Sequence, residues 1–156
     1  MRVIAVDAIP PADGDADAAD CEYLGGLESL DQLLRTSDYV SLHLPLTDET
    51  RHLLDARALA QMKRTAVIVN VARGPLIDQA ALVDALHAGA LRGVGLDVFE
   101  EEPLPPDHPI VGIENAVLTP HVAGLTRESS KRRARFAAEN VARALAGDKP
   151  IDGVVT

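Results

Sequence analysis

An arginine, an aspartate and a histidine stand where apolar runs of strand length end in this 156-residue chain: Arg73, Asp97 and His121. In an open α/β sheet, ligands bind beyond the carboxyl ends of the strands. An arginine there can hold a carboxylate through two parallel hydrogen bonds. A histidine can exchange a proton near neutral pH, and a neighbouring carboxylate favours its charged form and fixes its ring. These groups together are what the reduction of a 2-keto acid needs.

Each of these residues alone also has a structural explanation. An isolated arginine at a strand end more often caps its own loop, and a lone histidine there is more often structural than catalytic. Their occurrence at successive strand ends favours chemistry. His43 also ends an apolar run, whereas His52 and His87 fall in helical patterns and are predicted to be surface residues, and His108 falls in a Pro-rich loop.

The elements that would position these groups alternate between strand and helix, which predicts an α/β fold with a Rossmann-like, doubly wound parallel sheet. The apolar runs are nearly continuous, so both faces of the sheet are expected to be covered. The expected strands are Val3–Asp7, Tyr39–His43, Ala66–Val71, Gly93–Phe99 and Ala116–Thr119.

The helical patterns carry their own start and stop signals. A leucine stripe predicts one short helix over 27–34. Asp55 and Asp78 are expected to cap the next two helices, over Ala56–Met62 and up to Gly89, and a last helix is expected between Thr126 and Gly147.

The composition is that of a globular domain with a net charge of −9, which argues against nucleic acid as a partner. One cysteine, Cys21, allows no internal disulfide and fits a reducing compartment. The chain has no apolar run of membrane-spanning length and no signal-peptide pattern at its start, so a cytoplasmic protein without membrane contact is expected. The acidic run Asp13–Asp17 lacks the glycine and glutamate of a calcium loop and is predicted to be solvated, as is the basic cluster Lys131–Arg135.

The chain resembles the D-isomer-specific 2-hydroxyacid dehydrogenases over essentially all its length. The resemblance rests on three motifs in order, with support from two further segments. The motifs are Asn70–Gly74 with Ile77-Asp78, Asp97–Pro103 and Thr119–Gly124, and the supporting segments are His43–Thr47 with Thr50, and Glu139–Val141.

The resemblance implies roles for individual residues. Arg73 resembles the arginine that binds the substrate, His121 the acid/base, and Glu102 the partner of that histidine. Asp97 resembles the residue that holds the nicotinamide carboxamide of NAD. Other positions that resemble the lining of the cofactor site are Leu44, Pro45, Thr50, Val71, Ala72, Arg73, His121, Val122, Ala123 and Gly124.

Asp7 resembles the acid that binds the ribose hydroxyls of the adenosine. A carboxylate there repels a 2′-phosphate, so NAD is expected rather than NADP. The G-x-G-x-x-G fingerprint belongs about twenty residues before that acid, where no residues are available. Residues 1–156 are therefore expected to form a single, partial NAD-binding domain without its first strand, its phosphate loop or a substrate domain.

The loss of a central strand leaves three possible outcomes for Val3–Asp7 and Tyr39–His43. They pair with each other, the sheet splits, or another chain fills the gap. In each case low stability is expected for the isolated chain.

The function predicted from these residues is that of an NAD-dependent oxidoreductase acting on a small 2-hydroxy or 2-keto acid. The family that the chain resembles is usually dimeric, so a homodimer is one expected form of the protein. The alternative is a truncated, inactive dinucleotide-fold module that acts only in protein interaction. The chain start is expected to be internal to a longer reading frame.

Overall fold

The computed structural model describes residues 1–9 and 21–151. The acidic segment Asp13–Asp17 lies outside these residues. Contacts within the chain divide it into two units, Met1–His121 and Val122–Thr156. The first contains β1 (Ile4–Val6), β2 (Tyr23–Gly25), η2 (Leu27–Ser29), α1 (Leu30–Thr36), β3 (Tyr39–Leu42), α2 (Ala56–Ala60), β4 (Val67–Asn70), η3 (Gly74–Leu76), α3 (Gln79–His87), β5 (Gly93–Leu96) and β6 (Ala116–Leu118); the second contains α4 (Arg127–Ala146).

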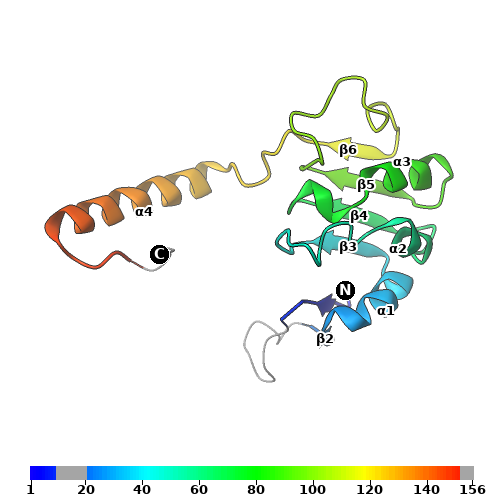
Figure 1. Ribbon diagram of the computed structural model, residues 1–156, viewed down its shortest axis with the longest axis horizontal. Helices are drawn as coiled ribbons and strands as arrows, with labels where there is room; N and C mark the ends of the chain where they lie inside the picture. The colour runs from blue at the N-terminus through cyan, green and yellow to red at the C-terminus, as the bar shows by residue number, and fades with distance from the viewer. Residues whose placement is uncertain (10–20, 152–156) are drawn as a thin grey trace. The chain divides into compact units, whose positions relative to one another are not determined.

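Four strands of the first unit form a parallel sheet in the order β3-β4-β5-β6 (Figure 1). One row across this sheet pairs Val40 with Ile68, Ile68 with Val94, and Val94 with Ala116. The five expected strands are all present, each shorter by one to three residues than the apolar run that predicted it. The predicted α/β fold with a parallel sheet is confirmed.

The sheet is split among the described residues. β1 pairs in parallel with β2, and these two strands form a sheet of their own, separate from β3. Of the three outcomes expected for the first two predicted strands, the structure therefore shows the split. β2 was not predicted, because its three residues are too few to give an apolar pattern and two glycines, Gly25 and Gly26, close it.

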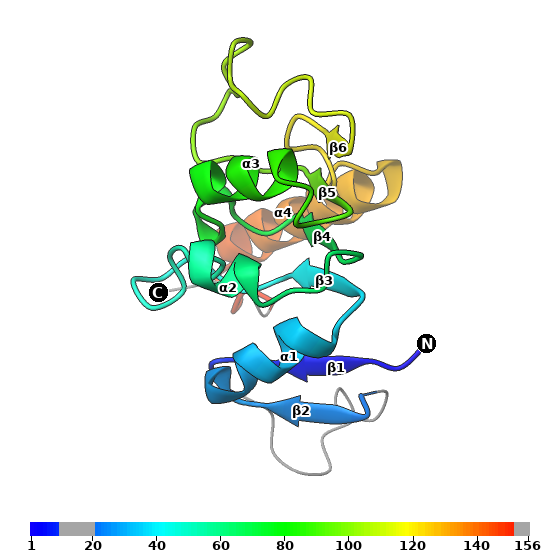
Figure 2. The ribbon, with the colours of Figure 1, turned by 90° about the vertical axis from the view of Figure 1, so that its right-hand side faces the viewer.

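Two helices cover one face of the four-stranded sheet. α2 and α3 lie on the same side of it (Figure 2), and Leu59 and Leu82 share one buried cluster with Ile68 and Leu96. Burial alternates along β3, where the even-numbered residues are buried and Tyr39 and Ser41 are exposed. The nearly continuous apolar run had led us to expect burial on both sides of this strand.

The capping bonds confirm the predicted N-caps, although α2 ends at Ala60, two residues before the expected Met62. Asp55 accepts from the Ala58 N–H at 2.8 Å, and Asp78 accepts from the Ala81 N–H at 3.0 Å. Gly89 follows α3 at φ 61°, a conformation that glycine adopts without steric cost. In the second unit, Thr126 caps α4 and Gly147 ends it at φ 78°.

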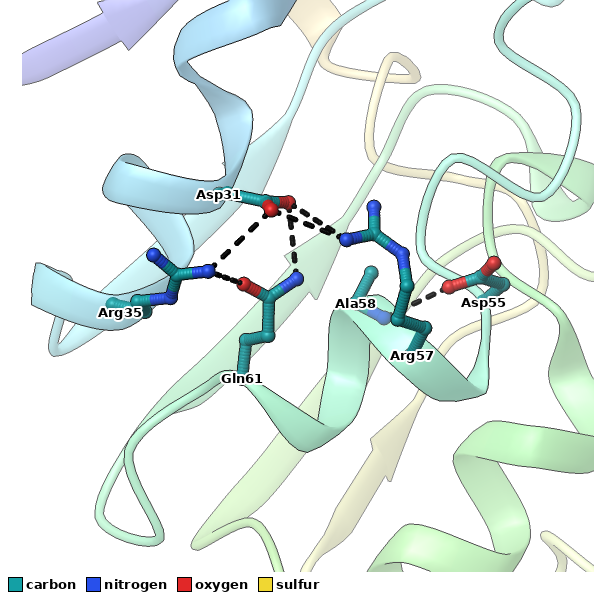
Figure 3. Close-up of polar contacts among 6 residues, drawn as sticks. All are labelled: Asp31, Arg35, Asp55, Arg57, Ala58 and Gln61. Carbon is teal, nitrogen blue, oxygen red and sulfur yellow. Dashed lines mark hydrogen bonds and ion pairs between the residues drawn. The ribbon is translucent and has the colours of Figure 1, made fainter.

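A polar cluster joins α1 to α2 (Figure 3). The Asp31 carboxylate accepts from the Gln61 amide at 2.9 Å and from the Arg57 guanidinium at 3.1 Å. Arg35 lies 3.5 Å from the same carboxylate and donates to Gln61 Oε1 at 2.6 Å. The Gln61 amide and then the Arg57 guanidinium hold the pKa of Asp31 below its ordinary value. Since α1 also contacts β1, this cluster helps attach the two-stranded sheet to the rest of the unit.

We predict that Asp31→Asn lowers the thermal unfolding midpoint at pH 7. The folded-state pKa of Asp31 is depressed, so its contribution is complete above the unfolded value of about 3.9 and is lost as the pH falls through the folded value. The difference in midpoint between wild type and Asp31→Asn should therefore shrink as the pH is lowered from 5 to about 3. Circular dichroism melts over this range measure it.

The matched control is Asp107→Asn, at an exposed aspartate that takes part in none of the ion pairs of the described residues. It should leave the midpoint unchanged at both ends of the range. A deficit of Asp31→Asn that stays the same at low pH would contradict the prediction.

Candidate active site

Three of the polar side chains singled out in the sequence follow neighbouring strands. Arg73 comes after β4, Asp97 directly after β5, and His121 after β6. Because β4, β5 and β6 are parallel neighbours, their carboxyl ends meet at one edge of the sheet (Figure 1). This edge is where ligands bind in open α/β sheets.

His121 is bound to Glu102 at this edge. The Nδ1 atom of His121 lies 2.7 Å from Glu102 Oε2, and the other carboxylate oxygen, Oε1, accepts from the Phe99 N–H at 2.9 Å. The hydrogen bond with His121 and then that with Phe99 hold the pKa of Glu102 below its ordinary value. The His121 side chain remains half exposed, so its imidazole is oriented on one side and accessible to a reactant.

The backbone of His121 has an uncommon conformation. Its φ is 54°, in the left-handed region that non-glycine residues rarely adopt. The His121 N–H donates to the Thr119 carbonyl at 3.1 Å, and the side chain is held by Glu102. Such strain costs of the order of 1 kcal/mol and persists where the surroundings determine the conformation.

Asp97 lies buried beside the histidine segment, with 3% of its surface exposed. Its Oδ1 atom accepts from the Thr119 hydroxyl at 2.5 Å. Its N–H donates to the Asn70 carbonyl at 3.0 Å, which continues the β4–β5 pairing to the strand ends. Asp97 therefore ties the ends of three strands together.

The turn that carries Arg73 is shaped by Asn70, a buried residue that the sequence reasoning did not assign a role. Asn70 Oδ1 accepts from the Ala72 N–H at 3.0 Å, and its amide donates to the Arg73 carbonyl at 2.9 Å. The Arg73 guanidinium is exposed and donates to the Ala72 carbonyl at 2.6 Å, a loop-capping contact. No ion pair among the described residues includes it. The only signal for Asn70 in the sequence is an amide at the last position of an apolar strand.

Two cavities open at this edge. One, of about 620 Å³, adjoins His121 and Glu102 and has mainly apolar walls; the other, of about 440 Å³, lies between the loops that follow β3 and β4. The first is lined by Phe99, Glu102, Pro103, Leu104, Leu118, Thr119, Pro120 and His121, and the second by His43, Leu44, Pro45, Leu46, Ala72 and Arg73.

The remaining predicted cofactor positions differ in their surroundings. Leu44 and Pro45 line the second cavity. Thr50 is buried, and its hydroxyl donates to the Pro45 carbonyl at 2.7 Å, so it shapes this loop from within. Asp7 follows β1 and accepts from the Ile9 N–H at 2.9 Å. Val71 is an exposed residue of the β4 turn, and Val122–Gly124 belong to the second unit.

The sequence reasoning missed a second histidine–glutamate pair. His52 lies in a turn at φ 52°, not in a helix, and its Nε2 atom is 2.6 Å from Glu100 Oε1. His52 is exposed, as expected. No sequence signal relates the two residues, which are 48 positions apart.

Within the described residues, no group of histidine, cysteine, aspartate and glutamate side chains is arranged to hold a metal ion. None of the described helices combines the length and apolar character needed to cross a membrane.

The chain matches known proteins along nearly all of its length. The model of one protein family, described as D-isomer specific 2-hydroxyacid dehydrogenase, NAD binding domain, matches residues 1–123. A glyoxylate reductase of Korarchaeum cryptofilum is 45% identical over 150 residues, which cover 96% of this chain and 44% of that enzyme. The chain thus spans less than half the length of this relative.

Two of the solved structures that resemble this fold are dehydrogenases. A D-lactate dehydrogenase of Lactobacillus jensenii, determined with NAD+, has a TM-score of 0.86 at 28% identity, covering 99% of this chain and 48% of the other. A D-isomer specific 2-hydroxyacid dehydrogenase of Xanthobacter autotrophicus, in complex with NADPH and MES, has a TM-score of 0.79 at 33% identity, covering 99% of this chain and 71% of the other.

We predict that Gly74→Ala disturbs the site through the main chain. A Cβ atom on Gly74 would overlap the Phe99 carbonyl group, and the Phe99 N–H holds Glu102. Because a backbone group cannot swing aside as a side chain does, the substitution should lower the free energy of unfolding by about 2 kcal/mol. Urea unfolding measures the loss.

Gly95→Ala is the matched control, since the nearest atom to its added Cβ would be Val69 Cγ2 at 3.9 Å, an ordinary contact. It should cost well under half as much. Equal losses of unfolding free energy in the two variants would contradict the prediction, because the overlap with Phe99 would then cost nothing.

Proposed function

This chain belongs to the D-isomer specific 2-hydroxyacid dehydrogenase family, through its NAD-binding domain, and we propose that it is the cofactor-binding and acid/base part of an NAD-dependent oxidoreductase. The substrate is a small 2-hydroxy or 2-keto acid. The observation that carries the proposal is the 2.7 Å contact of His121 with Glu102 at the sheet edge that also bears Arg73 and Asp97.

His121 is the proton donor and acceptor of this proposal. With Nδ1 directed at Glu102, the Nε2 atom is the one that exchanges a proton with the oxygen on C2 of the acid. It gives the proton when a keto acid is reduced and takes it when a hydroxy acid is oxidised. The Glu102 carboxylate accepts the Nδ1–H and fixes the orientation of the ring.

Arg73 binds the carboxylate of the acid. Its guanidinium is exposed at the turn after β4, and two parallel hydrogen bonds to a carboxylate would replace its contact with the Ala72 carbonyl. This orients the acid with C2 towards His121 and places a positive charge near the carbonyl that becomes polarised.

The residues at the edge fit a nicotinamide dinucleotide, which when bound supplies or accepts the hydride at C2. Leu44, Pro45 and Ala72 give the second cavity apolar side chains against which a ring can pack, next to the polar His43 and Arg73. Asp97 provides a buried acceptor for a carboxamide, and Asp7 provides a carboxylate at the end of β1 for ribose hydroxyls. Thr50 and Val71 contribute to the cofactor site by shaping the loops that follow β3 and β4.

A second candidate function is a dinucleotide-fold module that acts only in protein interaction. It is favoured by the lack of a G-x-G-x-x-G motif in this chain, whose backbone would hold the pyrophosphate. We propose instead that residues 1–156 form a partial NAD-binding domain of a cytoplasmic homodimer.

We predict that His121→Gln lowers kcat for NADH-dependent reduction of glyoxylate, hydroxypyruvate or pyruvate by about 10³-fold, because the proton donor is lost. Glu102→Gln should lower kcat by about 10²-fold. Arg73→Lys should mainly raise KM for the acid, since the two-point contact is lost. These effects are measured by steady-state kinetics on the protein encoded by the longest open reading frame that contains residues 1–156.

His87→Gln, at the exposed end of α3, is the control and should leave both constants unchanged. Fluorescence titration with NADH separates the two candidate functions. Absence of NADH binding in the longest in-frame product would favour the interaction module, and full activity of His121→Gln would overturn the acid/base assignment.

We also predict that Asp7→Asn reduces discrimination against NADPH. The amide can still accept from the Ile9 N–H but no longer repels a 2′-phosphate. The ratio of the NADPH and NADH dissociation constants should fall about tenfold, equivalent to about 1.4 kcal/mol. Parallel fluorescence titrations with the two cofactors measure this ratio, and an unchanged ratio would remove Asp7 from the ribose site.

A further inference from the structure

Glu100 is held at two points, next to the residues that position Glu102. Its N–H donates to Gln79 Oε1 at 3.0 Å, and its Oε1 atom lies 2.6 Å from His52 Nε2. Glu100 immediately follows Phe99, whose N–H binds the Glu102 carboxylate. The contacts of Glu100 therefore hold the turn that carries Glu102.

Gln79 is the buried end of this support. It is the first residue of α3, has 5% of its surface exposed, and reaches Glu100 over 21 positions of sequence. Its amide nitrogen Nε2 lies 2.9 Å from His108 Nε2. The other ring nitrogen of His108, Nδ1, accepts from the Ile110 N–H at 3.1 Å.

The three contacts from Glu100 through Gln79 and His108 to Ile110 hold four hydrogens and only two acceptors, which is one hydrogen too many for three hydrogen bonds. The two ends of this chain of contacts are backbone N–H groups, of Glu100 and Ile110, and each needs an acceptor. Because His108 Nδ1 accepts, a neutral imidazole carries its proton on Nε2. That N–H then faces the amide group of Gln79, which is also a donor, at 2.9 Å.

None of the three available changes in amide orientation or ring protonation removes the conflict. Turning the Gln79 amide gives His108 an acceptor but places the amide hydrogens against the Glu100 N–H. Moving the His108 proton to Nδ1 places it against the Ile110 N–H, and protonating the ring adds another donor. A mismatch between two donors, one on the buried Gln79 and one on the partly buried His108, costs free energy of the size of a lost hydrogen bond.

We propose that Gln79 is a positioning residue for the Glu102–His121 pair, and that its amide is in a conflict with His108 which a carboxylate at position 79 removes. That this pair exchanges a proton with a substrate rests on the proposed function. That Gln79 holds the pair in position does not. A carboxylate has one oxygen for the Glu100 N–H and one for the His108 Nε2–H, so every donor in the chain of contacts is satisfied. The N-terminus of α3 also favours a negative charge.

The first test is stability. Gln79→Glu should raise the thermal unfolding midpoint by about 3 °C, and more than Ala80→Glu, which adds the same charge to the same turn at an exposed position outside the contacts. In a His108→Ala background, the advantage of Gln79→Glu over Ala80→Glu should disappear. A midpoint below that of Ala80→Glu, failure of Gln79→Glu to fold, or an advantage that survives His108→Ala would each overturn the proposed conflict.

The second test reads the position of His121 without any assay of activity. The ¹⁵N shifts of the His121 ring report the proton on Nδ1 that faces Glu102. Gln79→Ala should move these shifts and the Glu100 amide signal away from their wild-type values. Gln79→Glu should leave them close to those values. Gln61→Ala, which disturbs the α1–α2 cluster instead, should leave them unchanged.

Ring shifts of His121 that are the same in Gln79→Ala and wild type would overturn the positioning role. Failure of the proposed function appears elsewhere, in NADH binding and turnover, because both tests here use only the folded chain. The two proposals can thus fail separately.

Discussion

The candidate site depends on one carboxylate that is bound at both oxygens. Glu102 accepts from the Phe99 backbone with one oxygen and contacts the His121 ring with the other. The first bond fixes the side chain to its own turn, so the second can fix the ring. Contacts that hold the main chain at Phe99 and Glu100 therefore also affect the position of the His121 ring. Gly74 does so by close packing, and Gln79 and His52 do so by hydrogen bonds.

The division of the sheet gives the two halves of the edge different support. β3 to β6 share a continuous ladder and a buried core under α2 and α3. β1, which leads to Asp7, pairs only with β2 among the described strands, and α1 with its Asp31 cluster attaches it to the rest. The residues assigned to proton transfer thus stand on the better supported sheet. The residue assigned to the ribose stands on the other.

Much of the fold follows from local patterns. Asp55, Asp78 and Thr126 cap helices because their side chains reach N–H groups three residues ahead, which the sequence alone specifies. Apolar runs mark five strands for a similar reason. The pattern fails for β2, whose three residues are defined only by their pairing with β1. It fails also for His52, whose turn conformation follows from a backbone bond to Pro75.

The sequence by itself determined the α/β class, the N-caps of three helices and the residues that stand at the ends of β4, β5 and β6. These depend on contacts within a few residues and on the common direction of parallel strands. The family resemblance also paired Glu102 with His121, whereas only the tertiary structure decided what His52 and His108 contact. Glu100 with His52 and Gln79 with His108 are 48 and 29 positions apart. Their meeting, and the surplus hydrogen at Gln79, result from the path of loops that no local pattern specifies.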